Sequence, residues 1–158
     1  MKYISATLFF AVSATGVSAG QTYDSTGTIA GQSAAEITPL SDGHMIMLLP
    51  SAHKSFDMAA DGHPFEDMTG TCDGAVEVLN GAALGQGLCV YENGAGETMA
   101  VRWTGENVEA DGTFHGQWII VGATGGLAGS TGGGDFTSLT DRNTGAQTVS
   151  LTGAMLTK

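Results

Sequence analysis

The stretch GATGGLAGSTGGGDF, residues 122–136, decides the fold of this chain. Seven of its fifteen residues are glycine. Glycine loses more backbone freedom on ordering than any other residue, so a stable helix is not expected here. Glycines inside a strand mark bulges, sharp bends or close approach of two backbones. The stretch therefore predicts a tight turn followed by a bent strand, as in a small β-barrel.

Short apolar runs with alternating side chains recur along the rest of the chain. Pairs such as Asn80-Gly81 and Asp111-Gly112 separate them, and these pairs suit hairpin turns because both residues can adopt positive φ. Hairpin-linked strands spaced in this way predict an antiparallel sandwich or barrel. Residues 50–68 are expected to form a strand and then a long loop that acts as a lid, because Pro64 cannot donate to a strand ladder. The other expected strands cover residues 23–29, 44–49, 76–79, 84–91, 99–103, 114–121 and 148–156.

The first residues are typical of a secretory signal peptide. Lys2 precedes a mostly apolar run, and Val17-Ser18-Ala19 offers small residues for cleavage before Gly20. The apolar run is too short to span a bilayer, which needs about 20 apolar residues. The sequence therefore predicts a signal peptide at residues 1–19 and one mature domain at residues 20–158, in the periplasm or outside the cell.

The charge is strongly negative, with five basic residues against sixteen acidic ones and a net charge of −11. Such a surface repels phosphate backbones and anionic lipids, so partners such as nucleic acid and membrane surfaces are not expected. The two cysteines, Cys72 and Cys89, predict a disulfide between adjacent strands, because an even cysteine count in an exported domain indicates a structural bridge.

The glycine stretch resembles the signature of the allene oxide cyclase and dirigent-like barrels. Residues 122–132 match the pattern G-G-T-G-x-[FY]-x-G-x-x-G, with Ala123 in place of the second glycine and Leu127 in place of the aromatic residue. Exported bacterial proteins of this barrel type share further features in the same order. In this chain these are Pro64-Phe65, Cys72, Cys89, Trp103, Trp118 and the glycine stretch.

This resemblance implies an all-β fold, an antiparallel eight-stranded calycin-like barrel. Proteins of this family hold a reactive intermediate in an apolar pocket and steer its ring closure or coupling by the shape of that pocket. Their specific pocket residues fall in parts of the chain that do not match here. The resemblance therefore implies a fold and no catalytic residue.

The aromatic strands supply the candidate ligand-binding residues. An eight-stranded barrel holds either packed side chains or one small ligand, and ligand sites combine an apolar wall with few polar anchors. Trp103, Trp118 and Phe114 are predicted to form the wall, and Arg102 is predicted to supply a polar group. Arg102 alternates out of phase with Trp103, and an acid such as Glu92 or Glu97 is the expected partner of its guanidinium.

Metal and nucleophile motifs are weak. No pair of histidines has zinc-ligand spacing, and no G-x-S-x-G motif occurs. His53, Met58, His63 and Met68 alternate at even spacing, and imidazole and thioether ligands suit Cu(I), although methionine also fills irregular cores.

The leading interpretation is non-enzymatic: an exported barrel that binds a small apolar ligand, or a stable envelope protein, without a cofactor. The alternatives are a cofactor-free cyclase or isomerase that works by pocket shape, and a periplasmic copper-binding protein. The oligomeric state stays open.

Overall fold

The computed structural model describes residues 20–158, so the predicted signal peptide lies outside the described residues. Within that range the chain forms eleven strands and one 3-10 turn, and no helix there is long and apolar enough to cross a membrane. The elements are β1 Thr22–Asp24, β2 Gly27–Ser33, β3 Glu36–Ser41, β4 His44–Leu48, β5 Ser51–Met58, β6 Thr69–Leu79, β7 Ala82–Glu92, β8 Thr98–Val108, β9 Phe114–Ala123, η1 Gly125–Leu127, β10 Thr131–Thr140 and β11 Ala146–Leu156.

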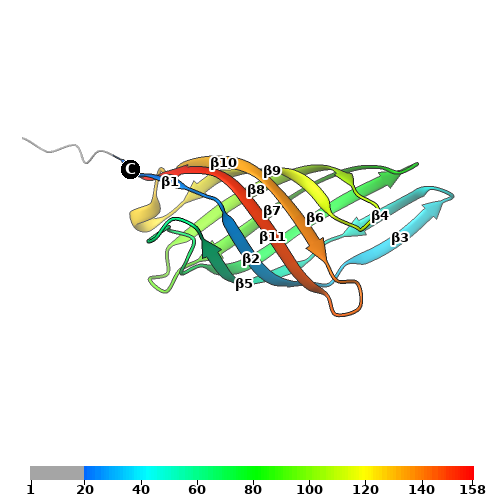
Figure 1. Cartoon of the computed structure of the whole chain (residues 1–158), viewed down its shortest axis with the longest axis horizontal. Coiled ribbons are helices and arrows are strands. Elements are labelled where there is room, and N and C mark those ends of the chain that lie inside the picture. The colour runs from blue at the N-terminus through cyan, green and yellow to red at the C-terminus, as the bar shows by residue number, and fades with distance from the viewer. Residues whose placement is uncertain (1–19) are drawn as a thin grey trace, which may run out of the picture.

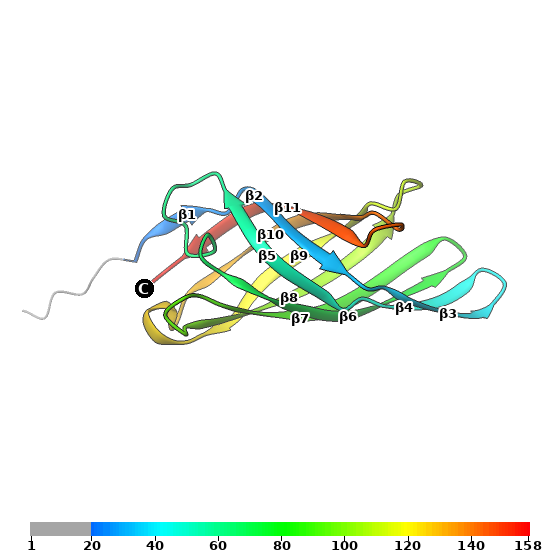
Figure 2. The same ribbon diagram turned by 90° about the horizontal axis from the view of Figure 1, so that it is seen from below.

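Eight of these strands close into an antiparallel barrel. Their order is β6-β5-β2-β11-β10-β9-β8-β7, and a further pairing of β6 with β7 completes the circle. The strands cross the barrel at a steep tilt (Figures 1 and 2). This confirms the predicted all-β fold, including the hairpins at Asn80-Gly81 and Asp111-Gly112.

The other three strands extend the barrel at its two ends. β4 pairs with the second half of β6, and β3 pairs with β4, so this hairpin projects beyond one end (Figure 1). β4 and β5 lie along the same side of β6 and are separated at Pro50, which has no N–H for a ladder. Strand β1 pairs with the last residues of β11 at the opposite end.

The predicted disulfide joins two neighbouring strands of the barrel. Cys72 on β6 lies directly opposite Cys89 on β7, and their sulfur atoms are bonded. The chain separation is 17 residues. Closing a loop of this size stabilises the fold by about 3 kcal/mol in the chain-entropy model. Both sulfurs face the barrel interior.

The glycine stretch forms a turn and then a strand, as predicted. Gly125 and Gly129 have φ angles of 60° and 81°, a region that favours glycine. The turn carries Leu127 into the barrel end, where its side chain is buried. The Gly126 N–H donates to the Glu97 carboxylate at 2.5 Å, which ties the turn to the β7–β8 connection.

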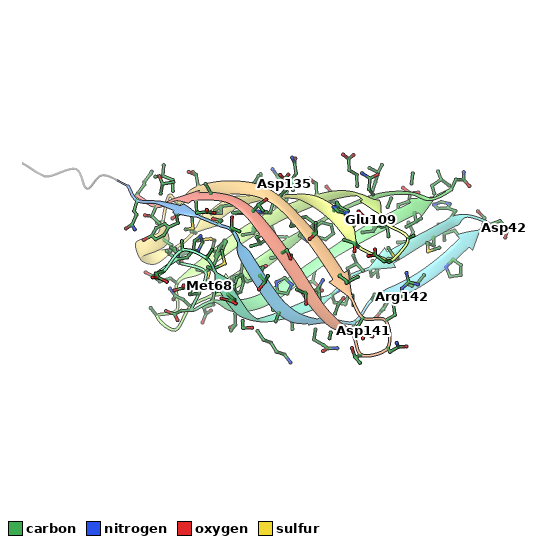
Figure 3. The ribbon with its side chains drawn as sticks, in the orientation of Figure 1. Asp42, Met68, Glu109, Asp135, Asp141 and Arg142 are labelled. Atoms are coloured by element: carbon green, nitrogen blue, oxygen red, sulfur yellow. A yellow bond between two sulfur atoms is a disulfide. The ribbon has the colours of Figure 1, made fainter. Side chains whose placement is uncertain are left out.

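A plug formed by residues 59–68 closes the same end of the barrel. Turn hydrogen bonds run from His63 N to Ala60 O and from Met68 N to Phe65 O. Phe65 is 2% exposed, and His63 and Met68 are equally buried. Figure 3 shows Met68 at this end, opposite the projecting hairpin. The segment predicted to be a strand and a lid is therefore strand β5 followed by a buried plug.

Candidate functional site

A cavity of about 90 Å³ lies inside the barrel, above the plug. Phe65 of the plug forms its floor, and half-buried side chains such as Leu49 and Trp103 lie toward the opposite, open end. Most of its wall is apolar. The lining residues are Ile29, Leu49, His53, Phe56, Phe65, Cys72, Cys89, Tyr91, Val101, Trp103, Phe114, Trp118, Phe136, Ser138, Gln147, Val149 and Leu151.

Glycines make room for the aromatic side chains of the wall. The Trp103 indole lies over Gly74 and Gly87, and the Phe114 ring lies over Gly105; a Cβ at any of these glycines would overlap the ring. The rings therefore lie against the strands rather than across the barrel, which keeps the interior open.

Three of these aromatic rings contact one another near the open end. The ring centroids of Trp103 and Phe114 lie 6.0 Å apart, and those of Trp103 and Phe136 lie 6.2 Å apart, both edge to face. Phe114 and Phe136 complete the triangle at 6.0 Å. Edge-to-face pairs of this kind add stability beyond the area they bury. The mutual contacts of the three rings therefore hold the mouth of the cavity in place.

A chain of four polar side chains crosses one side of the cavity. Gln147 Nε2 donates to Ser138 Oγ at 3.0 Å, and Gln147 Oε1 lies 3.3 Å from His53 Nε2. His53 Nδ1 lies 2.9 Å from Tyr91 Oη. Because the amide oxygen only accepts, His53 Nε2 donates to it, and His53 Nδ1 then accepts from the Tyr91 hydroxyl. The order of donation is therefore Tyr91 to His53 to Gln147 to Ser138.

Two further glycines allow this chain to form. In the strand register Gly31 stands between His53 and Gln147, and Gly70 stands between His53 and Tyr91. Without side chains at these two positions, His53 reaches partners two strands away on both sides. Its ring stacks on that of Tyr91 at a centroid distance of 5.8 Å.

The cavity wall is uncharged at neutral pH. Burial lowers the pKa of His53, which favours the neutral imidazole, and burial raises the pKa of the Tyr91 hydroxyl. No lysine or arginine of residues 20–158 lines the cavity. The lysines and arginines of that range are all exposed, namely Lys54, Arg102, Arg142 and Lys158.

The structure brings together three of the four predicted ligand-binding residues. Trp103, Trp118 and Phe114 line the cavity. Trp118 is 3% exposed, and its Nε1–H donates to the Thr152 carbonyl at 3.1 Å. The prediction for Arg102 is wrong in its placement, because side chains alternate along β8 and Arg102 projects from the exposed outer face, away from the cavity that Trp103 lines.

The polar members of the wall were not predicted from the sequence. His53, Tyr91, Ser138 and Gln147 come from four different strands, and no local motif links them. The available signal was glycine on the strands between them, at Gly31 of β2 and Gly70 of β6.

A second histidine, His63 of the plug, forms a polar cluster with Ser25. The Phe65 N–H donates to His63 Nδ1 at 3.1 Å, so the ring hydrogen is on Nε2, which donates to Ser25 Oγ at 3.0 Å. A catalytic serine would instead donate to its histidine. Ser25 is also completely buried. This serine–histidine pair is therefore structural.

The two histidines considered as copper ligands, His53 and His63, have no free ring nitrogen to offer a metal ion. Both nitrogens of His53 and both nitrogens of His63 have hydrogen-bond partners. In the part of the chain that the structure describes, no three His, Cys, Asp or Glu side chains are placed to hold a metal ion. No observation favours the copper alternative.

The buried histidines predict a loss of stability in mild acid. Burial lowers the pKa of His53 and of His63 below the ordinary value of 6.5. The unfolded chain therefore binds more protons than the folded one as the pH falls below 6.5, and the free energy of unfolding decreases from there toward the folded-state pKa values. We expect the urea midpoint to fall between pH 7 and pH 5.

Carboxyl groups do not account for this change. Hydrogen bonds lower the pKa of Asp24 and of Glu97 from ordinary values of 3.8 and 4.5, so they titrate at still lower pH. His53→Gln, which keeps a polar side chain, is expected to flatten the dependence. An unchanged midpoint from pH 7 to pH 5 in the parent protein would contradict the prediction.

Comparisons with known proteins support the fold. No family model matches the sequence, and no curated protein matches it. A solved structure of the pterocarpan synthase dirigent protein is similar, with a TM-score of 0.52 and 12% sequence identity over 96% of this chain and 99% of that one. At 12% identity this similarity shows a shared barrel fold and nothing more specific.

Proposed function

We propose that this protein binds a small, mainly apolar molecule inside its barrel. The observation that carries the proposal is the cavity of about 90 Å³ that glycines keep open, with aromatic side chains on its wall and a neutral polar chain on one side. Packed protein interiors leave few voids larger than a water molecule, whereas ligand sites combine an apolar wall with a few polar groups.

The same proposal places the mature protein in the periplasm or outside the cell. It is supported by the signal-like residues 1–19 and by the Cys72–Cys89 disulfide, a bond that persists in oxidising compartments. The alternative is a purely structural protein of the cell envelope, which would need no open cavity.

A second candidate function is catalysis by pocket shape. The similar solved structure is titled a pterocarpan synthase dirigent protein, and this fold similarity favours a cyclase or isomerase that uses no cofactor. Binding of a small apolar molecule is the shared requirement of both functions, so binding is tested first.

The test uses iodocyclohexane, an apolar ring whose iodine quenches tryptophan fluorescence. Trp103 and Trp118 line the cavity, so we expect saturable quenching in the parent protein. Leu49→Phe adds bulk to a lining residue at the mouth and should weaken binding, while Leu48→Phe changes its exposed neighbour, which does not line the cavity, and should not.

Quenching that rises linearly in all three proteins would show contact only by collision and would overturn the proposal. Native mass spectrometry of protein purified from its own host then separates the alternatives. A retained small organic mass is expected for a binding protein, and a bare polypeptide mass in every preparation favours the envelope role.

A further inference from the structure

The polar chain of the cavity wall ends in hydrogens that have no acceptor. Ser138 Oγ accepts from Gln147 Nε2, which leaves the Ser138 hydroxyl hydrogen unused among the hydrogen bonds of residues 20–158. The Gln147 amide has a second hydrogen, and it too has no acceptor within that range. Both side chains line the cavity and are half-buried.

Other donors of the wall are already engaged. The Tyr91 hydroxyl donates to His53, and Trp118 Nε1 donates to the Thr152 carbonyl. A donor without an acceptor is less favourable than an oxygen with an unused second lone pair. Ser138 and Gln147 are half-buried, so water or a ligand oxygen in the cavity can supply the acceptor that the wall near Ser138 lacks.

We infer that the cavity selects an uncharged ring compound that carries a ketone or ether oxygen, and that this oxygen accepts hydrogen bonds from Ser138 and Gln147. This inference rests on the proposed function. It goes beyond it by naming the chemical class of the ligand and the residues that determine specificity.

The charge and the size of the cavity further restrict the chemical class of the ligand. An anionic ligand would be buried beside a neutral wall, since the lysines and arginines of residues 20–158 are exposed and line no part of the cavity, and burial lowers the pKa of His53. An unpaired buried charge is strongly unfavourable. The volume of about 90 Å³ limits the enclosed part of the ligand to at most one small ring, with the remainder directed to the open end.

The experiment compares two rings of nearly the same shape, cyclohexanone and methylenecyclohexane, which differ in having C=O or C=CH₂. Their affinities are measured by displacement of iodocyclohexane from the full mature protein. Ser138→Ala removes the hydroxyl donor, Ser138→Thr keeps it, and Ser150→Ala is the matched control, because Ser150 is exposed on β11 and lies outside the cavity.

In Ser138→Ala we expect the ratio of ketone affinity to hydrocarbon affinity to fall about fivefold, the effect of losing one hydrogen bond. Ser138→Thr and Ser150→Ala should keep the parent ratio, and the Thr variant provides the comparison should the Ala variant fold poorly. Because the ratio is compared between proteins, the different hydration of the two free ligands cancels.

The outcomes separate the inference from the proposed function. If both rings bind and the ratio is the same in the parent and in Ser138→Ala, the inference is wrong and ligand binding stands. Tighter binding of cyclohexanecarboxylate than of cyclohexanone would also overturn the inference. If iodocyclohexane binds saturably but neither ring displaces it from any variant, the inference is wrong and ligand binding stands. If iodocyclohexane itself shows no saturable quenching, both fall.

Discussion

Replacing Phe65 with alanine is expected to lower the free energy of unfolding by about 3–5 kcal/mol, as for other buried phenylalanines. Phe65 is 2% exposed and is held at the centre of the plug. Its ring contacts those of Phe56, Tyr91 and Trp118, with centroid distances of 5.6, 6.3 and 6.0 Å. One substitution therefore removes contacts to three barrel strands at once.

Denaturant unfolding followed by circular dichroism measures this loss. Asp67→Ala is the matched control, because Asp67 belongs to the same plug and is exposed; it should unfold close to the parent midpoint. Since Phe65 is the cavity floor, the Phe65→Ala variant should also admit longer ligands than the parent. Equal midpoints for the two variants would show that the plug is only loosely attached to the barrel.

The two tryptophans are expected to respond very differently to truncation. Trp118 is 3% exposed, contacts Phe65 and donates to the Thr152 carbonyl. Trp118→Ala should therefore cost about 3–5 kcal/mol of stability. Trp103 is half-buried beside the cavity mouth, so Trp103→Ala should cost roughly half as much, because part of its ring already lacks packing partners.

Under conditions in which both variants are folded, Trp103→Ala is expected to weaken the binding of iodocyclohexane more than Trp118→Ala does. Trp103→Ala removes wall from the mouth and is expected to weaken the saturable quenching by iodocyclohexane, now read from Trp118. Unfolding midpoints and quenching curves of the same two samples provide the test. Equal stability losses at both positions would mean that the barrel interior is packed solid around Trp103.

The sequence was sufficient to predict the barrel because its local signals agree with the final fold. Alternation within β8 and β9, the Asn80-Gly81 hairpin and the positive φ of Gly125 all depend on the local chain. The disulfide followed from cysteine count and compartment, and β6 and β7 place Cys72 directly opposite Cys89.

Features that depend on long-range packing were not predictable in the same way. Strand β3 is exposed along its whole length and contains Pro39, so it carries no apolar alternation. The plug contains Pro64 between two buried side chains, and only the closed barrel end gives it something to fill. Arg102 is a different case, because its alternation with Trp103 along β8 already indicated that the two side chains lie on opposite faces of the sheet.

The polar part of the candidate site shows the same limit. His53 and Gln147 lie on strands that are far apart in sequence, and they meet only because β2 carries Gly31 between them. A single sequence shows the glycine and the two polar residues. It does not show the register that aligns them, which is set when the barrel closes.

The pairing of β2 with β11 also bears on how the chain folds. This seam places Ile29 opposite Val149, near the two ends of the chain, and contacts between distant residues form slowly because a long loop must close first. A growing chain can build the β6–β7 and β8–β9 hairpins early, but it cannot complete the barrel until its last strand has been synthesised. We therefore expect the barrel to close after these hairpins have formed, once β11 is available to pair with β2.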